Sequence, residues 1–254
     1  MLHGILGSGQ NLRAVAKRLV VDLPEWGFIL PDLRHHGESH AEPGPDTIAG
    51  VVGDLEALAV SLGIAPKTAI GHSFGGKVAL AWGEVQEAAG RPVDRVWALD
   101  VPPGLPDVPL ALQSEVIQVF RALRSIPLPL PRRDSVVTAL VERGFGLSIA
   151  QWMTTNVRPG EAGGFVWRFE LDGIERLFES DARTDLWPWL ESSTRRARVD
   201  VVRAGRSERW SAGELARFNR PNLHLHTLPD AGHWLHVDDP DGLHRRFLAE
   251  GLGP

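Results

Sequence analysis

The chain has 254 residues and a formal net charge of −5, and 43% of its residues are hydrophobic. This length fits one large α/β domain or a core with a modest insertion, and the acidic balance argues against nucleic acid or an anionic membrane surface as a partner. Because the chain has no Cys, disulfides, thiolate metal sites and a cysteine nucleophile are excluded. No secretory signal and no apolar run of about 18 residues is visible, so we expect a cytoplasmic protein without a membrane partner.

The first half of the chain alternates short apolar runs with helical patterns. Trp26 to Leu30 reads as a short strand, and Thr68 to Ile70 as another. Between them, apolar residues recur at helical spacing from Asp46 to Leu62, with Asp46 as the expected N-cap and Gly63 as the stop. A helix from Phe74 to Gln86 follows the second strand. This order predicts an α/β fold with a mostly parallel sheet and helices on both faces.

The middle of the chain interrupts this alternation. After an expected strand at Arg95 to Leu99, the sequence shows few strand patterns, many prolines and helical patterns that are clearest at 116–123 and 136–140. Strand and helix patterns then resume, with strands expected at 199–202 and 223–228 and a helix at 239–248. We therefore expect a core made of residues 1–101 and 199–254, with a helical cap insertion at 102–198.

The strongest motif is Gly71-His72-Ser73-Phe74-Gly75-Gly76, which follows a short apolar strand and opens a helix. This context is what a G-x-S-x-G nucleophile elbow needs, because the chain must turn sharply to expose the serine at the tip. The helix N-terminus then offers free N–H groups to a developing oxyanion. The motif predicts Ser73 as a nucleophile, although a glycine-rich turn with a structural serine would look the same in isolation.

A second glycine-rich turn, His3 to Gly9, lies well upstream of the serine. It fits the other half of an oxyanion hole, with the backbone N–H of Ile5 beside that of Phe74. A phosphate-binding loop is disfavoured, since Gln10 stands where that motif requires Lys. We expect His3 to shape the turn rather than to act in catalysis.

A histidine follows the last expected strand, in Pro229-Asp230-Ala231-Gly232-His233-Trp234-Leu235-His236. Imidazole has an ordinary pKa of about 6.5, so His233 could act as base and acid in turn near neutral pH. A turn histidine that caps the next helix is the alternative structural interpretation. We expect His236, the other candidate, to be packed or to act only indirectly.

Taken together, these segments resemble the α/β-hydrolase fold superfamily. The matching segments also include 32–39, in which Asp32, Arg34 and Gly37 are implied to shape a structural loop, and they occur in the order of that family along nearly the whole chain. The segments 71–77, 99–103 and 231–234 further resemble a subgroup of small bacterial and mitochondrial serine esterases. That resemblance implies hydrolysis of carboxylic esters or acyl thioesters, without a metal or an organic cofactor.

The sequence departs from the family at two places. Two strands and a hairpin usually precede the His-Gly turn, whereas only Met1 and Leu2 do so here. We therefore expect a sheet with fewer strands than the usual eight, or a covered edge. The usual position of the catalytic acid holds Ser207, with Glu208 next to it. In the esterase subgroup the acid follows an earlier strand, which implies Asp100 here and leaves Ser207 and Glu208 as auxiliary candidates.

The resulting hypothesis is a serine hydrolase that forms an acyl-enzyme on Ser73, with His233 as base, Asp100 as acid and Ile5 and Phe74 as oxyanion donors. Cleavage of a carbon–carbon bond and perhydrolysis would use the same groups, and a catalytically silent binding protein on this fold is a further alternative. The Trp- and Leu-rich cap predicts apolar, uncharged acyl groups. The oligomeric state is not indicated.

Overall fold

The computed structural model describes residues 1–39, 43–106 and 115–253. The described residues form a four-stranded parallel sheet in the order β1-β2-β5-β6, which is fewer strands than the usual eight. The strands are β1 (Thr68–His72), β2 (Arg95–Leu99), β5 (Arg198–Ala204) and β6 (Leu223–Leu228). Leu2 adds a parallel bridge to Gly71, so the N-terminal residues lie along the outer edge of β1.

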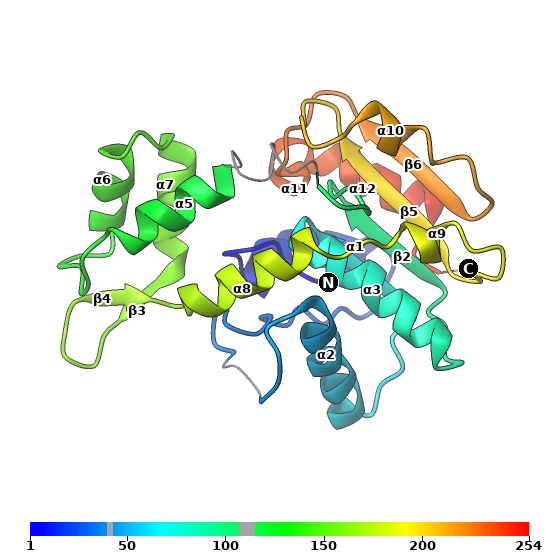
Figure 1. The fold of residues 1–254 in the computed structure, drawn as a ribbon, viewed down its shortest axis with the longest axis horizontal. Coiled ribbons are helices and arrows are strands. Elements are labelled where there is room, and N and C mark those ends of the chain that lie inside the picture. Colours follow the sequence, from blue (N-terminus) through cyan, green and yellow to red (C-terminus); the bar gives the residue numbers. More distant parts are fainter. Residues whose placement is uncertain (40–42, 107–114, 254) are drawn as a thin grey trace.

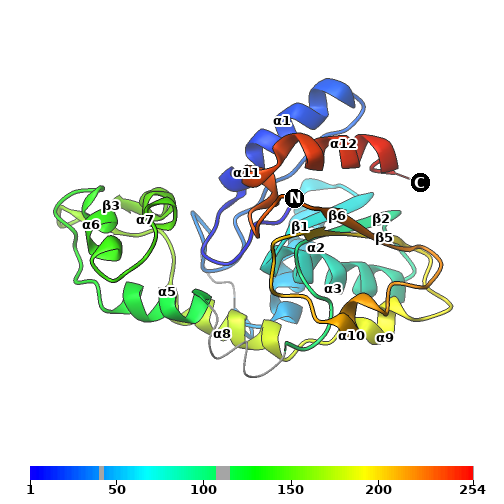
Figure 2. The same cartoon turned by 90° about the horizontal axis from the view of Figure 1, so that it is seen from above.

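Helices cover both faces of the sheet (Figure 2). One face carries α1 (Arg13–Asp22), α11 (Leu235–Asp238) and α12 (Pro240–Glu250), and the other carries α2 (Ile48–Leu62), α3 (Phe74–Ala88), α9 (Trp187–Leu190) and α10 (Ala212–Leu215). Side chains of the strands pack into two hydrophobic cores, one on each face of the sheet, because successive strand residues point to opposite faces. In β2, Val96 and Ala98 join the core on the α3 side, whereas Trp97 and Leu99 join the core on the α12 side.

The segment between β2 and β5 forms a lobe beside the sheet (Figure 1). The lobe contains α5 (Glu115–Arg124), α6 (Ser135–Val141), α7 (Leu147–Met153) and a small antiparallel hairpin of β3 (Val157–Pro159) and β4 (Phe165–Trp167). From the lobe, α8 (Leu171–Ala182) runs back to the core, where it contacts α2 and α3. The described residues also form two short 3₁₀ helices, at Gly9–Leu12 and Thr154–Asn156.

Two local predictions were wrong, and one element was not anticipated. Residues 26–30 form no strand, since their link to the first residues is a single hydrogen bond from the Met1 nitrogen to the Ile29 carbonyl (2.6 Å), and a strand requires a ladder of such bonds. The hairpin was not expected, because its strands have only three residues each. The N-cap of α2 is Thr47, whose hydroxyl accepts from the Gly50 amide at 3.1 Å, rather than Asp46.

Candidate active site

Ser73 occupies the tip of a sharp turn between β1 and α3. Its backbone has φ 52° and ψ −121°, a conformation that non-glycine residues rarely adopt, and its amide donates to the Leu99 carbonyl at 2.8 Å. The turn can close only around glycines. A Cβ on Gly71 would lie 1.9 Å from the Gly75 carbonyl oxygen, and one on Gly75 would lie 2.4 Å from the Leu2 carbonyl oxygen. The motif therefore folds as the strained strand-to-helix elbow that its spacing predicted.

The structure brings Ser73, His233 and Asp100 together, although they are far apart in the chain. His233 Nε2 lies 3.1 Å from Ser73 Oγ, and His233 Nδ1 lies 2.8 Å from Asp100 Oδ2. Asp100 directly follows β2 and His233 follows β6, so both side chains reach the same carboxyl edge of the sheet as the elbow. The arrangement places a base between a hydroxyl and a buried carboxylate, which is the geometry of a serine triad.

Asp100 is fully buried, and several donors stabilise its charge. Its Oδ1 accepts from the Trp210 indole at 2.8 Å and from the Ala204 amide at 3.0 Å. Burial alone would raise the pKa of Asp100, but the hydrogen bonds from His233, Trp210 and Ala204 outweigh burial and hold this pKa below its ordinary value. Asp100 is thus an anion at neutral pH, able to orient a neutral imidazole and to stabilise its protonated form.

The two auxiliary candidates lie elsewhere. Glu208 is exposed, and none of the hydrogen bonds or ion pairs found within the described residues joins it to His233. Ser207 lies in the turn after β5, and its buried hydroxyl has no hydrogen-bond partner in the described part of the chain. The observed partner of His233 Nδ1 is therefore the carboxylate of Asp100.

The expected oxyanion donors flank the serine. Gly4 lies against the elbow, where an added Cβ would be 3.5 Å from Ser73 Cβ, and Ile5 follows it in a turn closed by a 3.0 Å hydrogen bond from the Gly7 amide to the Gly4 carbonyl. Phe74 is the first residue of α3, so its amide has no partner within the helix. Within the described residues, no acceptor is found for the amides of Ile5 or Phe74.

Two buried histidines hold this turn in place. His3 Nδ1 donates to the Gly4 carbonyl at 2.8 Å while Nε2 accepts from the Leu33 amide at 3.0 Å. His36 accepts from the Leu6 amide at 3.0 Å and donates to the Arg34 carbonyl at 2.9 Å. Each ring both donates and accepts, so both are neutral. Burial lowers the pKa of His3 to about 4 and is the main reason that the pKa of His36 lies well below its ordinary value.

The loop at 32–39 adds further support to the turn. Asp32 accepts from the Gly9 amide at 2.8 Å and from the Glu38 amide at 2.9 Å, while Gly37 has φ 58° and no room for a Cβ beside that carboxylate. Arg34 is buried and makes two 2.7 Å hydrogen bonds to Asp54. These contacts are structural, as the resemblance implied.

Three supporting residues were not identified from the sequence. His72 donates from Nε2 to the His233 carbonyl at 2.8 Å, and its ring also packs on that of His236, with 4.9 Å between the centroids. Trp210 binds the carboxylate of Asp100, and Asn156 donates from Nδ2 to the Leu6 carbonyl at 2.8 Å. His72 lies inside the elbow motif and was the only one with a local signal. The other two reach the site from distant segments that no local pattern connects to it.

A pocket opens over Ser73 between the core and the lobe. Four parts of the chain line it. They are the N-terminal turn (Gly4, Ile5 and Leu6), the elbow (His72 and Ser73), the helices α5 and α7 (Val116, Val119, Ile149 and Trp152), and the C-terminal loops (Arg209, His233 and Trp234). Of the cap tryptophans, Trp152 lines this pocket, whereas Trp187 and Trp189 are buried in the core. The pocket is thus mainly apolar with the hydroxyl and imidazole at its base.

Away from the pocket, one cluster among the described residues has side chains that could hold a metal ion. Ligand atoms of Asp200, His226 and Glu250 all lie within 4.8 Å of one another. Arg198 already pairs with Asp200 at 2.9 Å and with Glu250 at 2.6 Å, and Arg95 lies 3.3 Å from Asp200. These two arginines compensate the carboxylates, which explains the cluster as an ion-pair network.

Comparisons with known proteins match nearly the whole chain. A family model described as the alpha/beta hydrolase family matches residues 1–246. The chain is 29% identical over 251 residues to the zebrafish (Danio rerio) sn-1-specific diacylglycerol lipase ABHD11, covering 94% of this chain and 73% of that protein. It is 26% identical to the Escherichia coli esterase YbfF, covering 96% and 89%. A solved marine microorganism esterase superposes with a TM-score of 0.83 at 24% identity, covering 98% and 92%.

Proposed function

Because this chain belongs to the alpha/beta hydrolase family, we propose that it is a serine hydrolase that cleaves carboxylic esters or acyl thioesters through an acyl-enzyme on Ser73. The observation that carries the proposal is the position of His233, with Nε2 3.1 Å from Ser73 Oγ and Nδ1 2.8 Å from Asp100. The relatives named as an esterase and a diacylglycerol lipase support an ester as substrate.

In the proposed mechanism, Ser73 Oγ attacks the acyl carbon while His233 Nε2 takes the hydroxyl proton. The carbonyl oxygen becomes an oxyanion, which the amides of Ile5 and Phe74 stabilise. His233 then gives its proton to the leaving group, which is the oxygen of an alcohol or the sulfur of a thiol. The bond between the acyl carbon and that atom breaks, and the acyl group remains as an ester on Ser73. A water molecule, deprotonated by His233, cleaves that ester and releases the carboxylic acid. Asp100 stabilises the imidazolium in both halves of the reaction.

The test is covalent labelling with an active-serine fluorophosphonate probe. We expect one adduct, mapped by mass spectrometry to Ser73, and a Ser73→Ala variant that keeps its circular dichroism spectrum but loses the adduct and nearly all p-nitrophenyl ester hydrolysis. Ser61→Ala is the matched control, because Ser61 is exposed and its hydroxyl only donates to the Leu58 carbonyl near the end of α2. An adduct on another serine, or no adduct and no hydrolysis in the native chain, would contradict the proposal.

A further inference from the structure

Arg209 differs from the rest of the pocket wall. Among the described residues that line the pocket, it is the only Lys, Arg, Asp or Glu side chain. The other lining residues include Trp152 and Ile149 of the lobe and Trp234 of the C-terminal loop. A substrate that fills this pocket therefore shares it with one positive charge.

Among the described residues, no ion pair joins the guanidinium of Arg209 to a carboxylate, although its positive charge opposes the rise that burial causes in the pKa of Asp181. Two other arginines of the C-terminal region are paired, since Arg206 lies 3.7 Å from Asp230 and Arg217 lies 2.9 Å from Glu191. The charge of Arg209 nevertheless reaches the site. Burial is the main reason that the pKa of His72 is well below its ordinary value, electrostatic interactions with His233 and His236 lower it further, and the positive charge of Arg209 makes a smaller contribution in the same direction. The cation is thus within electrostatic range of the elbow.

The backbone at Arg209 is fixed relative to the triad. The next residue, Trp210, is buried, and its indole donates to Asp100 Oδ1 at 2.8 Å. This hydrogen bond holds residue 210 on the carboxylate that also binds His233. The position from which Arg209 extends into the pocket wall is therefore set by the same contact that positions the base.

We propose that Arg209 binds an anionic group of the substrate, so that the preferred substrate is an ester or thioester that carries a carboxylate or phosphate. Arg209 is exposed in the free protein, so a neutral substrate that covers its guanidinium would remove water from this charge without replacing it, which is costly. A carboxylate or phosphate compensates that charge and can accept two N–H groups of the guanidinium at once. The inference rests on the proposed function and departs from the expectation of uncharged substrates that the Trp- and Leu-rich cap suggested.

The experiment compares kcat/KM within two pairs of matched substrates. The p-nitrophenyl hexanoate and mono-p-nitrophenyl adipate pair places the carboxylate on the acyl side. The 1-hexanoylglycerol and 1-hexanoylglycerol 3-phosphate pair places a phosphate on the alcohol side. Native protein, Arg209→Gln and Arg209→Lys are measured beside Arg206→Gln, which removes one charge from the same loop outside the pocket.

We expect the native protein to favour the charged member of at least one pair, and the pair concerned identifies the side of the substrate that carries the anion. Arg209→Gln should lower that charged-to-neutral ratio about tenfold or more, the usual scale of a charge-assisted hydrogen bond. Arg209→Lys should restore part of the ratio, and Arg206→Gln should leave it unchanged. Ratios that Arg209→Gln leaves unchanged in both pairs, or that Arg206→Gln lowers equally, would overturn the inference. Hydrolysis of the neutral esters that is lost in Ser73→Ala would still support the proposed function in that case.

Discussion

Asp100 has φ 46°, a left-handed conformation that few residues other than glycine adopt and that Asp and Asn tolerate best. Its amide donates to the Val202 carbonyl on β5 at 2.8 Å, so the backbone bends immediately after β2 and turns the carboxylate toward the loop that follows β5. There it meets Trp210 and Ala204 as well as His233. A carboxylate with three donors is restrained in orientation, and it can restrain the imidazole in turn.

The role of Asp100 can be tested by comparing it with Glu208 and Ser207, the two auxiliary candidates from the sequence. Asp100→Asn keeps the shape but removes the charge that stabilises the imidazolium, so we expect kcat for a p-nitrophenyl ester to fall about 10³- to 10⁴-fold. Glu208→Gln is the control and should change kcat little, because Glu208 is exposed. Ser207→Ala should have a moderate effect. A severe loss in Glu208→Gln with a mild one in Asp100→Asn would transfer the role to Glu208.

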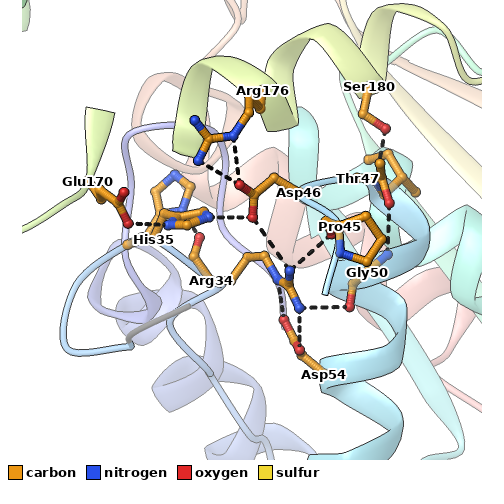
Figure 3. A network of polar contacts seen from close by, with 12 residues as sticks. Arg34, His35, Pro45, Asp46, Thr47, Gly50, Asp54, Glu170, Arg176 and Ser180 are labelled. Atoms are coloured by element: carbon orange, nitrogen blue, oxygen red, sulfur yellow. Dashed lines mark hydrogen bonds and ion pairs between the residues drawn. The ribbon is translucent and has the colours of Figure 1, made fainter. Parts of the chain in front are cut away.

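At the scale of elements, a network of charges joins the loop before α2 to α8 of the inserted segment (Figure 3). The buried ring of His35 lies between two carboxylates, with Nε2 2.6 Å from Asp46 and Nδ1 2.8 Å from Glu170. Asp46 also binds Arg176 of α8 at 2.7 Å and lies 3.5 Å from Arg34. Asp46 thus contacts cationic or hydrogen-bonding groups from both the core and α8.

This arrangement predicts that Asp46 fastens α8 to the core. Asp46→Asn removes the charge that faces Arg34 and Arg176, leaving a largely buried guanidinium partly uncompensated. We expect the free energy of unfolding, measured in urea, to fall by roughly 2–3 kcal/mol. Asp172→Asn is the control, since Asp172 is exposed on α8 and its ion pair among the described residues is with the exposed Arg124, and it should cost less than about 0.5 kcal/mol. Equal losses in the two variants would contradict this role for Asp46.

The same network shows why some elements could be predicted from the sequence and others could not. The bounds of β2 and β6 agree with the predictions because each is a compact apolar run with breakers beside it. Asp46 looked like an N-cap locally, but the groups that it binds come from 34–35 and from Arg176, far along the chain. Likewise Trp210 and Asn156 act through contacts that only the folded chain creates. Motifs indicated Ser73 and His233, and the family resemblance implied Asp100, whereas the residues that support them depend on tertiary structure.

At the scale of the whole molecule, the short sheet meets the inserted segment through the turn at Gly4–Gly7. The described residues contain no helix long and apolar enough to cross a bilayer. His3 and His36 form hydrogen bonds with this turn from the core, and Asn156 forms one from the lobe. His3 and His36 are buried, and each is neutral because its ring both donates and accepts a hydrogen bond. Their neutrality makes the stability of the whole fold depend on pH.

The direction of that dependence follows from the lowered pKa values. Burial lowers the pKa of His3 from 6.5 to about 4, so between these values the unfolded chain binds a proton that the folded chain excludes. The free energy of unfolding should therefore fall as the pH drops through this window, by about 2 kcal/mol for His3 alone between pH 7.5 and 5. His36 and His72, whose pKa values also lie well below the ordinary one mainly through burial, add to the fall.

Urea unfolding of the native chain and of His3→Asn at both pH values isolates the contribution of His3. His3→Asn should be less stable at pH 7.5, where it lacks the acceptor for the Leu33 amide, but should lose about 2 kcal/mol less on acidification. An identical loss in the two proteins would mean that His3 is not a neutral buried group.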